Sequence, residues 1–190
     1  MSANPASVAN PASVLAKAHD LLMAAPSTVA SLQMEHQAEL ERLFRALDRS
    51  SRIGRFNHFV SDAHLIAHAR TILYVASWGA GAFSNGRLRG VVEAYNYAEL
   101  GFAELAFAVE PGWCTQGIGS TLLRAATDWA AGSNVPMLRM VFARSNLAMR
   151  KLVVKADARI GLMLDEMTAD IELRCRHSGF LHVDDSEDRG

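Results

Sequence analysis

Apolar residues recur at the spacing of one helical face in four segments of the chain. The first segment begins at Ser31 and ends near Asp48, and its apolar face is formed by Leu32, Leu40, Leu43, Phe44 and Leu47. The same spacing predicts helices over residues 61–69, 117–131 and 146–156. We therefore expect two helices before the middle of the chain and two after it.

Between these helices the pattern becomes rich in β-branched and aromatic residues. Residues 71–78 and 88–97 predict two strands, and residues 79–86, with their glycines, predict the turn of a hairpin. Residues 103–109 predict a third strand. Further strands are expected at 137–143, 160–167 and 169–173. This order of elements predicts an α/β (α+β) fold, in which helices flank a mixed sheet.

The length and composition of the chain indicate one domain. Its 190 residues can bury one large core but not two. Residues 1–30 are rich in Ala, Ser and Pro and predict a flexible arm with a short helix near residues 14–23, while the acidic residues 178–190 predict a solubilising tail. We therefore expect the folded domain over residues 31–177.

The charges argue against a nucleic-acid-binding protein. The 19 Lys and Arg are interspersed among 20 Asp and Glu, whereas a nucleic-acid binder normally carries a basic surplus. Charges also interrupt every apolar stretch before the ~20 residues that a membrane-spanning helix needs. The N-terminus lacks the positive charge of a signal peptide, and Cys114 and Cys175 show no paired spacing. We expect a cytoplasmic protein that binds neither nucleic acid nor a membrane.

The segment most informative about chemistry covers residues 107–123. It combines a strand, a glycine-containing turn and the start of a helix. The first N–H groups of a helix have no partners within it, so such a turn can bind an anion such as a pyrophosphate. Gly117 and Gly119 suit this role because a side chain there would hold phosphates away from the backbone, although glycines at such turns also occur for packing alone.

Two other nucleotide-binding motifs do not fit this segment. Leu122 occupies the place of the third glycine of a dinucleotide-binding Gly-x-Gly-x-x-Gly motif, and the turn follows three strands instead of opening a βαβ unit. A P-loop would require Gly-Lys-Ser/Thr, which the sequence lacks. The turn therefore calls for a different phosphate-bearing ligand.

Three stretches together resemble those of the GNAT superfamily of acetyl-CoA-dependent N-acetyltransferases. Cys114 to Gly119 resembles the coenzyme A motif Q/R-x-x-G-x-G/A, and Asn146 to Lys155 resembles the family's Asn-x-x-Ala-x-x-x-Tyr-x-Lys helix. Ser51 to Phe56 resembles a Ser-Arg-x-x-Arg-Phe stretch seen after the first helix of many bacterial members. The resemblance covers about residues 31–175 and implies a GNAT-like, largely antiparallel central sheet.

The resemblance implies transfer of an acetyl group from acetyl-CoA, as co-substrate and without a metal, to an amine that attacks directly in a ternary complex. The acceptor would be a small-molecule amine or a protein Lys or N-terminus. Pantetheine would lie along the strand and the pyrophosphate on the turn. The residues implied for binding coenzyme A are Phe107, Ala108, Val109, Cys114, Thr115, Gln116, Gly117, Ile118, Gly119, Ser120 and Asn146. Because relatives are often dimers, a homodimer is also compatible.

An acceptor amine must lose a proton before it can attack. For an alkylamine with a pKa of about 10.4, deprotonation at pH 7 costs about 4.6 kcal/mol, so a base is needed. Many relatives carry an Ala-Glu pair on the strand that leads to the acetyl site, which makes Glu104 the candidate base. Glu93 and Glu99 are weaker alternatives, and a solvated or ion-paired carboxylate explains Glu104 equally well. A backbone N–H near residues 107–109 is the candidate donor to the thioester carbonyl.

Three positions depart from the family pattern. Cys114 stands where Gln or Arg is preferred, which removes one polar contact near the phosphates. Val153 or Val154 stands where many members carry the Tyr that protonates the departing thiolate, and neither can act as an acid. Asp157 stands where Gly often ends the helix, and Asp tolerates the left-handed conformation required there. The alternatives to an active enzyme are therefore a coenzyme A-binding sensor or inactive partner subunit, and an interaction module that has lost the ligand.

His64 and His68 have the spacing of two metal ligands. They lie four residues apart on a predicted helix, which places both on one face. No Glu follows His64 and no third ligand is evident. We therefore expect a structural or surface role for them, and no metal.

Overall fold

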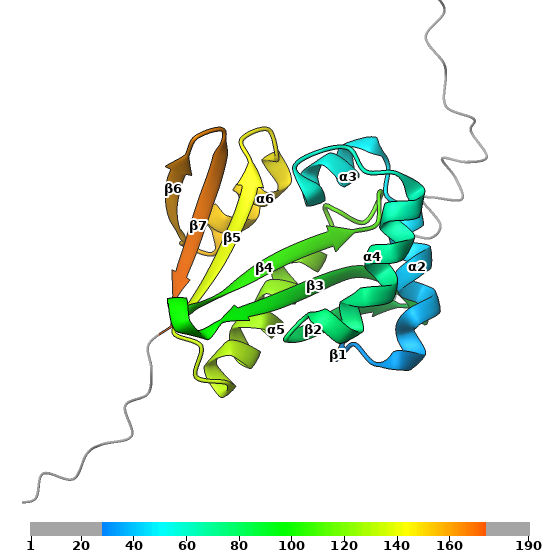
Figure 1. The fold of residues 1–190 in the computed structure, drawn as a ribbon, viewed down its shortest axis with the longest axis horizontal. Helices are drawn as coiled ribbons and strands as arrows, with labels where there is room; N and C mark the ends of the chain where they lie inside the picture. The colour runs from blue at the N-terminus through cyan, green and yellow to red at the C-terminus, as the bar shows by residue number, and fades with distance from the viewer. Residues whose placement is uncertain (1–27, 174–190) are drawn as a thin grey trace, which may run out of the picture.

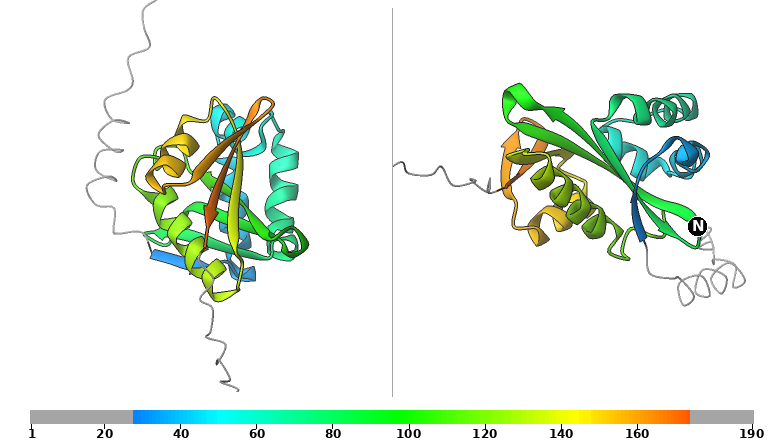
Figure 2. Two further views of the ribbon diagram at one scale, coloured as in Figure 1. Left: turned by 90° about the vertical axis from the view of Figure 1, so that its left-hand side faces the viewer. Right: turned by 90° about the horizontal axis from the view of Figure 1, so that it is seen from below.

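The structure, a computed structural model, describes residues 28–173 of the chain. Most of the predicted arm with its short helix, the predicted tail and Cys175 lie outside the described residues. Within the described part, one seven-stranded sheet is flanked by helices on both faces (Figures 1 and 2). The predicted α/β fold with a mixed sheet is confirmed.

The strands follow the order β1-β2-β3-β4-β5-β7-β6 across the sheet. Their bounds are β1 (Thr28–Ser31), β2 (Trp78–Ser84), β3 (Arg87–Tyr97), β4 (Phe102–Val109), β5 (Met137–Ala143), β6 (Arg159–Met163) and β7 (Glu166–Glu172). Every neighbouring pair runs antiparallel except β4 and β5, which run parallel. The sheet is therefore largely antiparallel, and its single parallel pair lies at the centre.

The helices form a layer on each face of the sheet (Figure 2). They are α2 (Gln37–Arg45), α3 (Arg49–Phe56), α4 (Asp62–Val75), α5 (Ile118–Gly132) and α6 (Leu147–Lys155), with short 3-10 turns η1 (Met34–His36) and η2 (Ala98–Leu100). Leu122 of α5 and Val153 of α6 belong to the core cluster that contains Leu105 of β4. Leu65 of α4 belongs to the cluster that contains Ala108. Because strand residues alternate between faces, β4 contributes to both cores.

The first predicted strand is wrong over most of its length. Residues 71–75 continue α4, and β2 begins only at Trp78. Ile72 is 1% exposed and follows Leu65 and Ala69 at helical spacing, so it extends the buried face of the helix. Burial against the sheet therefore outweighed the β-propensity of this segment.

The turn predicted over residues 79–86 is also wrong, although the hairpin itself is confirmed. These residues are mostly strand β2, and the turn is formed by Asn85 and Gly86, both with positive φ. Such a two-residue turn suits the twist of a hairpin. Gly81 lies inside the strand, and its lack of a side chain is required there because a Cβ would come within 2.5 Å of Leu88 and 2.8 Å of Phe83. The glycines mark close packing rather than a loop.

Two elements were not predicted. β1 pairs with β2 although residues 28–30 were expected in the arm. Helix α3 begins where the carboxylate of Asp48 accepts a hydrogen bond from the backbone N–H of Ser51, and it ends at Asn57, which has a φ of 60°. Its sequence shows no buried apolar face, so hydrophobic periodicity could not reveal it.

The second half of the chain follows the predicted order. The strands and helices expected from residue 103 to residue 156 are confirmed within one or two residues. The closing pair of strands is confirmed as well, with its turn at Leu164, before the break expected near residue 168. Asp157 has a φ of 54°, the left-handed conformation expected at the end of α6.

Truncation of Leu65, which is fully buried in the core cluster shared by α2, α4 and the sheet, tests the packing of α4. We expect Leu65→Ala to lower the free energy of unfolding by about 2–5 kcal/mol, because it removes buried methyl groups and leaves a cavity. Urea denaturation followed by circular dichroism measures the change. Tyr74→Ala on the same helix removes a side chain that is 72% exposed and should change stability by no more than about 0.5 kcal/mol. Equal losses for both variants would contradict the packing described here.

Candidate active site

A cavity lies where β4 and β5 separate. The two strands pair at only two positions, Ala103 with Leu138 and Glu104 with Arg139, and then diverge with α3 over the open side (Figure 1). The cavity volume is about 330 Å³, within the range of small-molecule sites. Its lining comes from α3, β4, β5 and α6: Gly54, Arg55, Phe56, Asn57, Glu104, Leu105, Ala106, Phe107, Val141, Phe142 and Met149.

The cavity receives side chains from both faces of the sheet. Leu105 and Phe107 point toward the α5 and α6 side, whereas Glu104 and Ala106 alternate to the side of α3. Between Leu105 and Val109, β4 still pairs with β3 but no longer with β5. The opening therefore connects two helical layers and leaves one backbone edge of β4 free to bind a ligand.

Glu104 brings a carboxylate into this cavity that no hydrogen bond or close ion pair from the described residues holds. It is partly buried, and within residues 28–173 it makes no hydrogen bond and no ion pair within 4.0 Å. Its neighbour across the strand pair, Arg139, is held by Asp170 through two contacts of 2.8 and 2.9 Å. Such a bidentate pair occupies the guanidinium. The hydrogen bonds to Asp170 raise the pKa of Arg139, and the charge of Glu104 adds to this effect, so Glu104 interacts with Arg139 only at longer range.

The two other carboxylates considered from the sequence differ from Glu104. Glu99 lies exposed in η2 and does not line the cavity. Glu93 is fully buried beneath α3 and α4, where Arg55 donates to it at 2.8 Å and Tyr95 at 2.6 Å, with the His68 ring nitrogen at 3.1 Å. Burial alone would raise the pKa of Glu93, but the charge of Arg55 and the hydrogen bonds of His68 and Tyr95 outweigh it and lower the pKa from 4.5 to about 2. Glu93 is therefore a structural anion.

The turn between β4 and α5 carries the predicted phosphate site. Gly117 precedes α5 with a φ of 80°, and no heavy atom lies within 4 Å of the position of an added Cβ. The first hydrogen bond into the helix runs from the backbone N–H of Thr121 to the carbonyl of Gly117. In the described part of the chain, the N–H groups of residues 117–120 find no acceptor. They are free to bind an anion.

The side chains predicted to bind coenzyme A lie in three environments. Cys114, Thr115, Gln116 and Gly117 are exposed in the turn, and Gly119 and Ser120 are half-buried at the start of α5. Ile118 is 1% exposed and Ala108 is 4% exposed, so these two can contact a ligand only through their backbone. Phe107 and Val109 are partly buried at the edge of the α5 core. The site residues therefore follow one continuous path from the cavity to the turn.

An ion-pair network holds the start of this turn, and no sequence signal indicated it. Glu110, the residue after β4, accepts from Arg42 of α2 at 3.0 Å and from Arg89 at 2.9 Å. The guanidinium of Arg89 also lies 4.4 Å from the ring centroid of Trp113. Arg89 is the extra residue of a β-bulge, which redirects its side chain. The pairing joins residues that lie 68 and 21 positions apart in the chain.

The surroundings of Asn146, of the two valines at the tyrosine position and of Cys114 limit what these side chains can do chemically. Both polar atoms of the Asn146 side chain bind within the protein, since Oδ1 accepts from the N–H of Met149 and Nδ2 donates to the carbonyl of Gly54. Val153 is buried in the core and Val154 is 66% exposed. Burial raises the pKa of the Cys114 thiol, and the charge of Asp48 adds to the effect, so the thiol is not activated as a nucleophile.

The two histidines with metal-ligand spacing pack against other side chains in the structure. His68 pairs with Glu93, and both His64 and His68 contact the ring of Phe56 edge-on. No group of three or more His, Cys, Asp or Glu side chains comes together in this part of the chain. None of its helices has the length and apolar character needed to span a bilayer.

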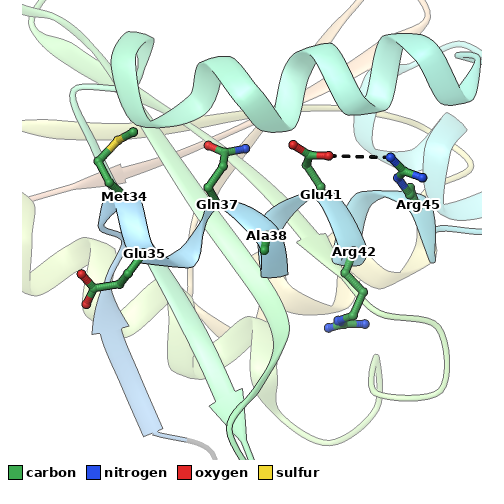
Figure 3. A pocket seen from close by; sticks show the side chains of 7 residues that line it. All are labelled: Met34, Glu35, Gln37, Ala38, Glu41, Arg42 and Arg45. Atoms are coloured by element: carbon green, nitrogen blue, oxygen red, sulfur yellow. Dashed lines mark ion pairs between the residues drawn. The ribbon is translucent and has the colours of Figure 1, made fainter.

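A larger hollow of about 600 Å³ lies along α2, but its lining side chains do not surround a common position. Figure 3 shows that its lining comes from one short stretch of the chain, residues 34–45 of η1 and α2. Most of its charged groups are already paired, since Glu41 binds Arg45 and Arg70, and Arg42 binds Glu110. One helical surface cannot surround a substrate, so the cavity between β4 and β5 is the candidate site.

The sequence and the fold both match known proteins. The model of the acetyltransferase (GNAT) family matches residues 34–156. A search of the curated proteins found no match. The solved GNAT domain of S. lividans PAT is similar with a TM-score of 0.67 and 17% identity, over 77% of this chain and 90% of that one.

Two solved structures with ligands are also similar. One is the PaiA N-acetyltransferase of Thermoplasma acidophilum in complex with coenzyme A, with a TM-score of 0.62 and 18% identity over 78% of this chain and 100% of that one. The other is a phosphinothricin acetyltransferase of Sinorhizobium meliloti in complex with AcCoA, with a TM-score of 0.62 and 16% identity over 78% and 89% of the two chains. At these identities the likeness concerns the fold.

The role of Glu93 as a structural anion is tested by Glu93→Gln. Removing the charge leaves Arg55 buried beside a neutral group, so we expect the free energy of unfolding at pH 7 to fall by about 3–5 kcal/mol, whereas exposed Glu99→Gln changes little. Because the folded pKa of Glu93 lies below 4.5, its contribution is complete above pH 4.5 and is lost as the pH falls toward about 2. Urea denaturation across this range should therefore show a weaker acid dependence for Glu93→Gln than for the wild type. Parallel curves would contradict the assignment.

Proposed function

Because this chain belongs to the acetyltransferase (GNAT) family, we propose that it is an N-acetyltransferase that uses acetyl-CoA to acetylate an amine in a ternary complex. The observation that carries the proposal is the unpaired carboxylate of Glu104 in the opening between β4 and β5. Free N–H groups at the start of α5 support the same proposal. Coenzyme A and AcCoA in the similar structures are consistent with it.

The free edge of β4 and the turn fit the two parts of coenzyme A. A pantetheine arm carries amide groups, which suit the unpaired backbone of β4 between Leu105 and Val109. The N–H groups of residues 117–120 suit a pyrophosphate, and the dipole of α5 favours negative charge at the same point. Backbone groups carry both contacts, so a Cys at position 114 is compatible with binding.

Glu104 would take the proton of the acceptor ammonium. Acetyl-CoA supplies the acetyl group as a thioester, which the deprotonated amine attacks. Glu104 faces the α3 side of the opening, whereas Leu105 and Phe107 face the side where pantetheine would lie. With pantetheine on that side, the base and the thioester would lie on opposite sides of the acceptor nitrogen. An N–H of the free edge near residues 107–109 would stabilise the oxyanion.

Neither residue at the position of the family's tyrosine can protonate the leaving thiolate. Val153 is in the core and Val154 is an exposed aliphatic side chain. The pKa of an unperturbed thiol is about 8.5, so its thiolate is stable enough that water can deliver the proton. Binding of acetyl-CoA without turnover on any amine would favour a coenzyme A-binding sensor instead. The acceptor, a homodimer and a cytoplasmic location stay predictions.

Gly117→Ala tests the turn as the phosphate site. At a φ of 80° a Cβ costs roughly 1–2 kcal/mol, so we expect lower stability and weaker acetyl-CoA binding by calorimetry. Gly132→Ala at the other end of α5 is the matched control, because that position is uncrowded and has no positive φ. It should leave both quantities unchanged or slightly raise stability. Unchanged acetyl-CoA affinity in Gly117→Ala would contradict the proposed cradle.

Glu104→Gln tests the base. A positioned base contributes about 10²- to 10⁴-fold, so we expect kcat to fall by that factor while the Kd for acetyl-CoA stays within about twofold. Raising the pH should partly restore the rate of the variant, because the fraction of free amine increases. Glu99→Gln controls for the loss of one carboxylate at the surface. An unchanged rate and pH profile in Glu104→Gln would show that another group removes the proton.

A further inference from the structure

Helix α3 spans the opening between the two halves of the sheet. Gly54, Arg55 and Phe56 of α3 line the cavity together with β4 on one side and β5 and α6 on the other. Glu104 faces this helix across the cavity, on the side where an acceptor would enter. The position of α3 therefore determines how much of Glu104 an acceptor can reach.

Polar contacts hold α3 firmly to the β3 and α4 side. Arg55 donates to the fully buried Glu93 at 2.8 Å. Arg52 donates to the carbonyl of Leu47 at 2.9 Å and lies 2.6 Å from Asp62 at the start of α4. A buried ion pair is costly to break, because it leaves an unpaired charge. The attachment of α3 to β3 and α4 is therefore stable.

The attachment to the other half of the sheet is slighter. In residues 28–173, two side-chain hydrogen bonds cross from α3 and the residue after it to the β5 and β7 side. Asn146 Nδ2 donates to the carbonyl of Gly54 at 3.0 Å, and Asn57 donates to Glu166 at the start of β7. The first contact is close, since a Cβ on Gly54 would lie 3.2 Å from Asn146 Nδ2.

Asn146 thus uses its two polar atoms for two structural tasks. Oδ1 caps α6 by accepting from the N–H of Met149 at 3.1 Å, and Nδ2 binds Gly54. Each atom therefore has one hydrogen-bonding position used within the protein. Cap and tie share one planar amide, so the orientation of α6 determines where Gly54 is held.

We propose that Asn146 is a positioning residue for the acceptor side of the site, which ties α3 across the β4–β5 opening and so restricts which amines reach Glu104. The part of this inference that concerns the choice of acceptor amine rests on the proposed acetyltransferase function. Its structural part, the tie itself, is independent of that function. The cofactor contact that the family resemblance implies for Asn146 is a separate prediction, which the acetyl-CoA affinity of the variant tests.

Asn146→Asp separates the two tasks of the side chain. Asp caps a helix as well as Asn does, so α6 keeps its N-cap, but its carboxylate cannot donate to the carbonyl of Gly54. Glu166→Ala removes the second crossing contact. Asn134→Asp is the matched control, because Asn134 is exposed and undergoes the same change of amide to carboxylate.

Hydrogen exchange measured by mass spectrometry reports the tie without any substrate. We expect peptides covering residues 49–57 to exchange on the order of 2- to 12-fold faster in Asn146→Asp, the factor that corresponds to one hydrogen bond, while peptides of α5 are unchanged. Glu166→Ala should act in the same direction, and Asn134→Asp should match the wild type. Unchanged exchange over residues 49–57 in Asn146→Asp would overturn the tie.

Steady-state kinetics then test the effect on the acceptor. With small amines (methylamine, putrescine) and bulky amines (phenethylamine, a lysine-containing hexapeptide), we expect Asn146→Asp to shift the ratio of kcat/KM between bulky and small acceptors by at least about fivefold. The Kd for acetyl-CoA from calorimetry should stay within about twofold. A tenfold loss of acetyl-CoA affinity with an unchanged ratio would make Asn146 a cofactor ligand and overturn the proposal, as would an unchanged ratio alone.

The two hypotheses fail differently. If the wild type binds no acetyl-CoA and acetylates none of these amines, the proposed function fails and the kinetic part of this inference fails with it. Faster exchange of α3 in Asn146→Asp would then still establish the tie as a property of the fold. If the wild type is active and the variant differs from it in neither exchange nor selectivity, only the role of Asn146 fails.

Discussion

The separation of β4 from β5 is the constraint on which the site depends. Two parallel strands at the centre of a sheet normally keep their ladder, because unpaired backbone groups inside a protein are costly. Here the ladder stops after Ala103 and Glu104, so the next residues of β4 keep one free edge. The opening that results brings Glu104 from one face and Leu105 from the other into the same cavity.

The surrounding structure stabilises this opening from two sides. On the α3 side, Glu93 is fully buried and would be unstable alone, but its contacts with Arg55, His68 and Tyr95 make it a fixed point for the helix. The contrast with Glu104 is instructive. Glu93 is held by three side chains, whereas Glu104 makes no hydrogen bond and no close ion pair in residues 28–173 and is the base that we propose. Two carboxylates on one face of adjacent strands thus differ in role because their surroundings differ.

On the other side, the turn before α5, which we propose binds the pyrophosphate, is anchored by contacts outside it. Glu110 binds Arg42 and Arg89, and Arg89 lies on the ring of Trp113, so the start of the turn is attached to α2 and β3. These contacts hold the turn in place although the N–H groups of residues 117–120 make no hydrogen bonds within the described part of the chain. A turn anchored in this way loses little conformational entropy when it binds an anion, which favours affinity.

The sequence by itself determined the elements whose information is local. Periodic apolar positions identified α5 and α6, the glycines identified the turn before α5, and the ordered motifs identified the family. The choice of Glu104 as the base rests on an Ala-Glu pair common among relatives and stays a prediction. The sequence-based prediction failed where contacts between distant residues determine the structure. Ile72 continues a helix because it is buried in the core. Gly81 marks a place in a strand where Leu88 and Phe83 leave no room for a Cβ.

Only the tertiary structure decided which of the candidate side chains are free. Glu93 and Asn146 are polar residues with plausible roles in the sequence, yet Glu93 is buried against Arg55 and Asn146 is committed to Gly54, 92 positions away. Helix α3 has no buried apolar face, so the sequence pattern did not predict it, and the structure shows that it lines the opening. The physical reason is that a sequence pattern records the preferences of a residue, whereas the availability of a polar group depends on partners brought together by the fold.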